Sequence, residues 1–298
     1  MKSKTGQNIV LTVIGGVGYG FLASGSEFES DSEAVKSEKI KTPYGDVSIS
    51  FFSTGCFDIA FISRHQGKKH VPPHKVNYSA LVAAAQNIGA PVLSVNSVGL
   101  MRSVPLTVNC ETEEPLKSES QVTPDSFSIF PLFIPNDFID MTKNRVCTFY
   151  DEETVHADMS DPYCMDIRKQ LFSVLKNQNQ SYSEGVYLCT EGSRFETKAE
   201  IRMYAQFADV VGMTGVPEVV LAKEAGLCYA SLCILTNPAA GLSQGNIVTA
   251  DEVKVCADQN QKVVFSIISK LAEKLNQRNT EKIEKRCFCK EATESGKL

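Results

Sequence analysis

The sequence has no long uninterrupted apolar stretch and no block of basic residues. Every apolar run is too short to span a bilayer, so we expect no membrane as a partner. With 30 basic and 35 acidic residues the net charge is −5, which does not suggest nucleic-acid binding. Residues 9–14 form a short apolar run that ends in a glycine turn, without the cleavage site of a signal peptide. A cytoplasmic location is therefore expected.

Regular cysteine spacing is also absent. The ten cysteines are scattered, and several lie inside apolar segments, which indicates buried thiols in a reducing compartment rather than a disulfide scaffold. Cys287 and Cys289 form the one close pair, and a metal or redox role for them would need partners that the tail does not supply. We interpret residues 286–298 as a frayed tail and expect no metal site.

No long linker divides the 298 residues, so residues 1–298 are expected to form one α/β domain. Short apolar runs alternate with helical patterns and turns, as they do in α/β proteins. Residues 91–95 are a predicted strand, with Asn96 and Ser97 at its tip. Two polar stretches, residues 24–39 and 110–128, are predicted to be surface loops.

A glycine turn over residues 15–20 follows the first predicted strand. Such a turn lets backbone N–H groups approach a phosphate closely. A dinucleotide-binding fingerprint would need its last glycine where Phe21 stands. A dinucleotide-dependent oxidoreductase is therefore an alternative that rests on this turn alone.

Three turns with polar groups occur within residues 187–241. The first places Phe195 beside Glu196, the second has Thr214 shortly before a predicted helix start, and the third places Asn237 after a predicted strand. An aromatic face can stack on a flat heterocycle, and a carboxylate and an amide can bind its polar edge. A hydroxyl at a helix start can bind an anion. This combination is suited to a heterocycle and an anion together.

These residues resemble the trimeric family of purine nucleoside phosphorylases and methylthioadenosine phosphorylases. The run VPEVVLAKEAGLCYAS is similar to the methylthioadenosine phosphorylase branch, and Glu196 with the run TNPAAG resembles the methylthioinosine variant. The resemblance implies a single domain with a mixed central β-sheet flanked by helices, and a homotrimer. The residues that match the family patterns are Gly192, Arg194, Phe195, Glu196, Met213, Thr214, Val216, Pro217, Glu218, Thr236 and Asn237.

The resemblance also implies roles for individual residues. Arg64 and His65 match a phosphate-binding pattern, although this sequence has one residue more before His70. The implied phosphate ligands are Gly16, Arg64, His65, Asn96, Ser97 and Thr214. The implied nucleoside contacts are Phe195, Met213 and, from a neighbouring subunit, His156. Met203 is expected to be a core residue instead.

Phosphorolysis of an N-glycosidic bond needs a phosphate placed under the sugar and stabilisation of the departing purine. It needs no side-chain nucleophile and no cofactor, which is consistent with the lack of a G-x-S-x-G elbow. Glu196 and Asn237 are the expected catalytic pair. A carboxylate accepts from a ring N1–H and an amide donates to N7 or O6, so the pair favours a 6-oxopurine. The expected partners are a purine nucleoside and inorganic phosphate, and the expected products are free purine and a 5-methylthioribose 1-phosphate.

Two further possibilities stay open. The chain could be a general purine nucleoside phosphorylase for inosine and guanosine. It could also be a weakly active member that binds nucleosides, because it departs from the family pattern at Val17, Leu100, Ser193 and Gly215.

Overall fold

The computed structural model describes residues 8–16, 33–66, 70–107, 121–122, 132–242, 249–279 and 287–293. The strands are β1 (Ile9–Gly15), β2 (Glu33–Thr42), β3 (Gly45–Ser53), β4 (Asp58–Ser63), β5 (Val92–Leu100), β6 (Val104–Pro105), β7 (Gln121–Val122), β8 (Leu132–Met141), β9 (Tyr182–Thr190), β10 (Val210–Gly212) and β11 (Tyr229–Pro238). The helices are α2 (Tyr78–Ile88), α3 (Met165–Asn177), α4 (Lys198–Tyr204), α5 (Glu218–Glu224), α6 (Ala250–Gln259) and α7 (Gln261–Asn279), with 3-10 turns η1 (Pro73–Lys75) and η3 (Cys289–Glu291).

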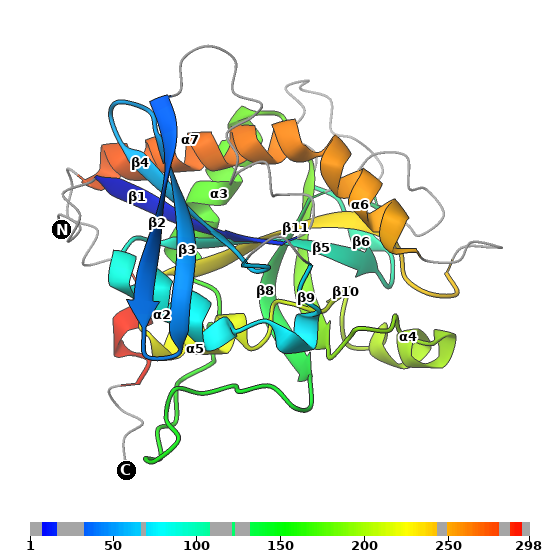
Figure 1. Ribbon diagram of the computed structural model, residues 1–298. Coiled ribbons are helices and arrows are strands. Elements are labelled where there is room, and N and C mark those ends of the chain that lie inside the picture. The colour runs from blue at the N-terminus through cyan, green and yellow to red at the C-terminus, as the bar shows by residue number, and fades with distance from the viewer. Residues whose placement is uncertain are drawn as a thin grey trace.

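One large mixed sheet organises the described residues, as Figure 1 shows. Its strand order is β10-β9-β8-β11-β5-β1-β4-β3-β2, and β10 pairs with β5 as well, so that five of the strands close into a ring. Strands β4, β1, β5 and β11 run parallel, which places their carboxyl ends at one edge of the sheet. Ligand sites of α/β proteins lie at such edges.

Helices cover both faces of this sheet. Helices α3, α6 and α7 pack on one face, and α2 and α5 on the other (Figure 1). Strand residues alternate between the two cores: in β5, Val92 and Val98 contact the α2 side, while Leu93 and Val95 contact the α7 side. The expected α/β fold with a mixed sheet and flanking helices is confirmed.

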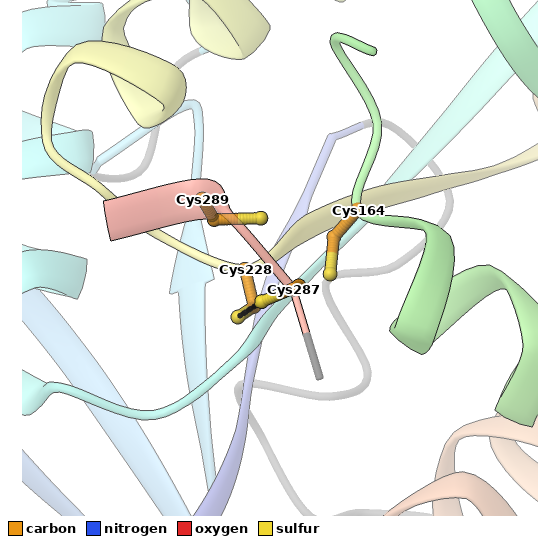
Figure 2. Close-up of side chains that lie close together, drawn as sticks. All are labelled: Cys164, Cys228, Cys287 and Cys289. Carbon is orange, nitrogen blue, oxygen red and sulfur yellow. Dashed lines mark hydrogen bonds between the residues drawn. The ribbon is translucent and has the colours of Figure 1, made fainter. Parts of the chain in front are cut away.

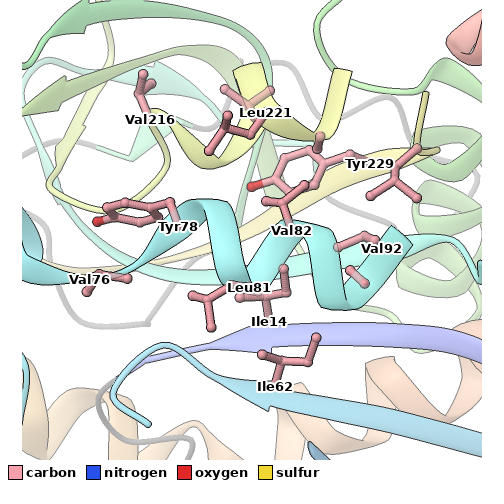
Figure 3. Close-up of a cluster of buried hydrophobic side chains, with 14 of the residues drawn as sticks. Ile14, Ile62, Val76, Tyr78, Leu81, Val82, Val92, Val216, Leu221 and Tyr229 are labelled. Atoms are coloured by element: carbon pink, nitrogen blue, oxygen red, sulfur yellow. The ribbon is translucent and has the colours of Figure 1, made fainter. Parts of the chain in front are cut away.

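The core on the α2 side shows how local sequence becomes packing. Alanine-rich α2 is capped by the Asn77 side chain, which accepts from the Ala80 N–H, and it ends at Gly89, whose φ of 77° suits a left-handed C-cap. In Figure 3, Leu81 points towards the strand side chains below the helix, while Val82 points towards Tyr229. Both side chains are 1% exposed, so α2 fixes the distance between the sheet and α5.

Three expectations about loops and strand ends are wrong. Residues 33–39 of the stretch 24–39, which was predicted as a loop, belong to edge strand β2 (Glu33–Thr42), whose Ser, Lys and Glu residues are compatible with one open side. Asn96 and Ser97 lie inside β5 rather than at its tip, because pairing with β11 continues to Leu100. Residues 287–293 are not frayed, since Cys289 and Ala292 are both 5% exposed.

Some of the expectations concern residues that the structure does not describe. Residues 24–32, Val17 and the remainder of the glycine turn lie outside the described residues, as does the stretch 110–128 apart from β7. Met203, expected in the core, is 48% exposed on α4. Among the helices that the structure describes, none combines the length and apolar character that crossing a membrane requires.

Candidate active site

A cavity of about 620 Å³ lies at the carboxyl ends of the parallel strands. This volume is in the range of small-molecule sites, which run from roughly 300 to 1,000 Å³. The structure brings together there the predicted residues Gly16, Arg64, His65, Asn96, Ser97, Phe195, Glu196, Met213, Thr214 and Asn237. His156 is exposed and does not line the cavity.

Arg64 is buried at the edge of the cavity and is held by the carboxylate of Glu218, a residue that the sequence analysis matched to the family pattern without assigning it a role. Its Nε and Nη2 atoms donate to the two oxygens of Glu218 at 2.7 and 2.9 Å. Nη1 donates to the Val95 carbonyl and Nη2 to Ser94. Of the five N–H groups of a guanidinium, four are thus used by the protein and one, on Nη1, is left for a ligand. The Nε and Nη2 groups of Arg64 are therefore occupied by Glu218, so this pair of donors is not available for a bidentate contact with phosphate.

His65 lies beside Arg64 and is neutral near pH 7. Burial, with further contributions from His70 and Arg64, lowers the pKa of His65 to about 4. Its Nδ1 accepts from the Val71 N–H at 3.3 Å, so the neutral ring carries its proton on Nε2. A Cβ at Gly16 would lie 3.5 Å from both His65 Nε2 and Arg64 Nη1. These two donors therefore converge at the Gly16 backbone.

The polar groups of β5 differ in what they can offer a ligand. The Asn96 amide nitrogen donates to Ser94 and Ser231, each at 2.8 Å, and its oxygen accepts from the Thr214 hydroxyl at 2.8 Å. All side-chain hydrogens of Asn96 are thus used within the protein. Ser97 Oγ is buried and has no hydrogen-bond partner among the described residues. Ser97 is free to contact a ligand, whereas Asn96 orients Thr214.

Tyr187 supports the turn that carries Met213 and Thr214. The Tyr187 ring is 1% exposed, and its hydroxyl accepts from the Gly215 N–H at 3.1 Å. A Cβ at Gly212 would lie 2.3 Å from the Tyr187 hydroxyl oxygen, and one at Gly215 would lie 2.7 Å from the ring. The turn can lie on the ring only because both positions are glycine. This close approach explains why Gly215, a departure from the family pattern, is a glycine here.

Glu196 and Asn237 also line the cavity, and each keeps hydrogen-bonding capacity. Glu196 Oε1 accepts from Thr190 at 2.6 Å, and its Oε2 has no bond within the described part of the chain. Asn237 Nδ2 donates to the Pro238 carbonyl at 2.8 Å, which leaves one amide hydrogen. Phe195 is 38% exposed beside them. A carboxylate oxygen, an amide N–H and an aromatic ring thus line the same cavity.

Sequence reasoning missed several supporting residues. Arg145 donates to the carbonyls of Thr190, Glu191 and Val216, and so ties the end of β9 to the start of α5. No motif marks Arg145 or Tyr187, whereas Glu218 lies within the matched run and could have been found there. Arg194, also in a matched run, pairs with Glu200 on α4 and does not line the cavity.

Comparisons with known proteins agree on one family. Residues 122–273 match the family model described as "Phosphorylase superfamily". A protein of Methanosarcina acetivorans named as a probable S-methyl-5′-thioinosine phosphorylase is 42% identical, with 97% of this chain and 96% of the relative covered. The 6-oxopurine nucleoside phosphorylase of Pyrococcus furiosus is 34% identical over 95% of this chain and 97% of its own length.

Solved structures give the same result. The methylthioadenosine phosphorylase from Schistosoma mansoni in complex with adenine superposes with a TM-score of 0.79 at 25% identity, covering 97% of this chain and 99% of that one. A methylthioadenosine phosphorylase from an antarctic soil metagenomic library has a TM-score of 0.75 at 28% identity, covering 98% and 93%.

Proposed function

Since the chain belongs to the phosphorylase superfamily and is an enzyme of purine nucleoside phosphorolysis, we propose that its preferred substrate is a 5′-methylthio nucleoside of a 6-oxopurine. Inorganic phosphate is the second substrate. The products are the free purine and 5-methylthioribose 1-phosphate. The observation that carries this proposal is the cavity itself, which is lined both by the residues that we assign to phosphate and by those that we assign to the base.

We assign phosphate to the side formed by Gly16, Arg64, His65 and Ser97. The support is the spare N–H of Arg64, the Nε2–H of His65 and the unpaired hydroxyl of Ser97. The charge of Arg64 is already balanced by Glu218, so directed hydrogen bonds contribute more to anion binding here than net charge does. Because hydrogen bonds to a placed anion are directional, phosphate is held in one orientation towards the sugar.

Thr214 has a different part in this proposal. Its hydroxyl donates to Asn96 Oδ1, so the oxygen offers lone pairs rather than its hydrogen. A ribose hydroxyl can donate to such an oxygen. A contact from Thr214 to phosphate requires its hydroxyl to rotate away from Asn96. Met213, on the same turn, supplies an apolar contact to the sugar.

The base is assigned to Phe195, Glu196 and Asn237. Glu196 accepts the N1–H of a 6-oxopurine through the oxygen that Thr190 does not use. The spare amide hydrogen of Asn237 is donated to N7 or O6, where negative charge gathers as the bond to the sugar breaks. Both side chains thus act on the leaving group, which makes them the catalytic residues of this proposal.

The alternative of a general 6-oxopurine nucleoside phosphorylase shares this base site. It is favoured by the name of the relative from Pyrococcus furiosus, while the 5′-methylthio substrate is favoured by the name of the more similar relative from Methanosarcina acetivorans. The two differ only in the 5′ substituent. A methylthio group prefers an apolar environment and a 5′-hydroxyl needs a hydrogen-bond partner.

The decisive test is purine release from inosine, adenosine and their 5′-methylthio forms, measured with and without phosphate. We expect release only with phosphate and the highest kcat/KM for 5′-methylthioinosine. Higher kcat/KM for inosine would establish the general phosphorylase instead. Phosphate-independent release, or none from any of the four, would contradict the proposal.

We further propose a homotrimer in which His156 reaches the 5′ end of a nucleoside bound to a neighbouring subunit. His156 is exposed and lies away from the cavity of its own chain, and Val146 of the same segment is 62% exposed. Light scattering coupled to gel filtration gives the mass of the assembly. A monomer with full activity would contradict this arrangement.

A further inference from the structure

Four cysteines converge at the end of the sheet opposite to the cavity. Cys164, Cys228, Cys287 and Cys289 come from three separate parts of the chain, and Figure 2 shows their side chains gathered around a common space. Their four sulfur atoms all lie within 4.8 Å of one another. The Sγ atoms of Cys228 and Cys287 are 3.3 Å apart. The group contains no histidine and no carboxylate.

Backbone hydrogen bonds fix the elements that carry these sulfurs. Cys164 is the N-cap of α3, and its N–H donates to the Tyr229 carbonyl at the start of β11 at 2.7 Å. Cys228 directly precedes β11, and its carbonyl accepts from the Val92 N–H at 2.8 Å. The Ala292 carbonyl accepts from the Asp158 N–H at 2.9 Å, which holds the C-terminal segment. Backbone hydrogen bonds therefore hold each of the three segments that carry the cysteines.

The chemistry of the group differs from that of the other buried cysteines. Burial raises the pKa of Cys189 to about 11 and that of Cys233 to about 12, so these separate thiols stay neutral. Four thiols that face one another can instead share a soft cation as thiolates, since the cation offsets their charge. Thiolates select Zn²⁺ among common divalent ions, and a position at a helix N-terminus favours the thiolate of Cys164.

The spacing indicates a single ion. Zn–S bonds of about 2.3 Å in a tetrahedron place the sulfurs about 3.8 Å apart. The observed limit of 4.8 Å requires only small side-chain shifts to reach that value. Cys164 and Cys289 are buried, while Cys228 and Cys287 are half-buried.

We propose that Cys164, Cys228, Cys287 and Cys289 bind one Zn²⁺ in a closed, structural tetrathiolate site. On binding, the four thiols lose their protons to solvent and the four sulfurs become the ligands. With all four positions filled by protein, the ion has no open position for a substrate, so its role is to fasten the C-terminal segment to α3 and β11. The partners that Cys287 and Cys289 lack in the tail are thus supplied by residues 164 and 228, and the expectation of no metal site is replaced by this proposal.

The first test uses the full-length protein, expressed with zinc and purified without chelator. Plasma mass spectrometry should give one zinc per chain, and X-ray absorption should give four sulfur ligands at about 2.3 Å. All ten thiols should react after denaturation in the absence of reductant. Cobalt substitution should produce the visible absorption of a tetrahedral thiolate site.

Cysteine variants locate the ion. The double variant Cys287→Ser/Cys289→Ser should lose the zinc and unfold at a lower temperature. The matched control Cys56→Ser/Cys147→Ser, which changes two exposed thiols, should keep both. If the first variant does not fold, the metal content and thiol count of the unmodified protein decide the question.

Three results would overturn the proposal. A deficit of two or four reactive thiols without zinc would show disulfides in place of the ion. Ten thiols and no zinc, even after addition of Zn²⁺ to the reduced protein, would show a plain thiol cluster. Equal zinc in the double variant and the control would place the ion elsewhere.

Discussion

The polar groups near the two ends of strands β5 and β11 differ in whether they are directed at a ligand or at one another. Towards the carboxyl ends, Ser97 of β5 and Asn237 of β11 keep hydrogen-bonding capacity and line the cavity. Beside the amino end of β11, four sulfurs lie within 4.8 Å of one another. One end is organised around a ligand that comes and goes. The other, in our proposal, is organised around an ion that stays.

Among the residues that line the cavity, Arg64 differs from Ser97 and His65 in how far the protein already uses its hydrogen-bonding groups. Arg64 and Glu218 are almost fully buried and bind each other, and Arg64 also lines the cavity. Ser97 and His65 line the same cavity; Ser97 Oγ has no hydrogen-bond partner among the described residues, and the neutral His65 ring carries its proton on Nε2. The cavity is therefore lined by a buried ion-paired arginine together with donors that have no partner in the part of the chain that the structure describes.

The largest expected effect is on this buried pair. Glu218→Ala leaves the Arg64 guanidinium buried without its counter-ion, and we expect the free energy of unfolding to fall by about 3–5 kcal/mol. Denaturant unfolding measures it. The control Glu273→Ala removes an exposed ion pair with Lys270 and should cost less than about 1 kcal/mol. Equal losses in the two variants would contradict the supporting role of Glu218.

A smaller effect is expected at the turn over Tyr187. Gly215→Ala places a methyl group 2.7 Å from the Tyr187 ring, and overpacking of this kind typically costs about 1–3 kcal/mol. Because the turn carries Thr214, KM for the nucleoside should rise as well. Unfolding curves and steady-state kinetics measure both. Unchanged stability and kinetics would mean that the turn does not depend on close contact with the ring.

The smallest effect is the pH dependence from His65. Its pKa is about 4 in the folded protein and near 6.5 in the unfolded chain, so the unfolded chain takes up the proton first. Stability should therefore be lost as pH falls from 6.5 towards 4, and His65→Gln should make this slope shallower. Solvent screening at the half-buried ring keeps the change small. Parallel slopes for His65→Gln and the unmodified protein would contradict the assignment.

The difference between the two ends also explains what the sequence could reveal. Phe195, Glu196, Met213, Thr214 and Asn237 lie in short contiguous patterns, and the cavity brings these predicted residues together. The α/β fold followed from apolar runs separated by turns. Both the site residues and the fold class could be predicted because their signals come from residues that are close together in the sequence.

Other features depend on contacts between distant residues. Glu218 reaches Arg64 across 154 positions, and Cys228 reaches Cys287 across 59, so spacing gave no sign of either contact. Strand β2 was missed because an edge strand tolerates a polar sequence that resembles a loop. Met203 was placed in the core because its apolar side chain alone does not reveal which face of α4 is open.

The central claim, that Glu196 and Asn237 select the base, is tested most directly by Asn237→Asp. The measurement is the ratio of kcat/KM for 5′-methylthioinosine to that for 5′-methylthioadenosine. A carboxylate cannot donate to O6 but can accept from a 6-amino group, so the ratio should fall by about 5- to 150-fold, the equivalent of roughly 1–3 kcal/mol. Asn136→Asp, which adds the same charge at an exposed position on β8, should leave the ratio as it was. An unchanged ratio in folded Asn237→Asp protein would contradict the claim.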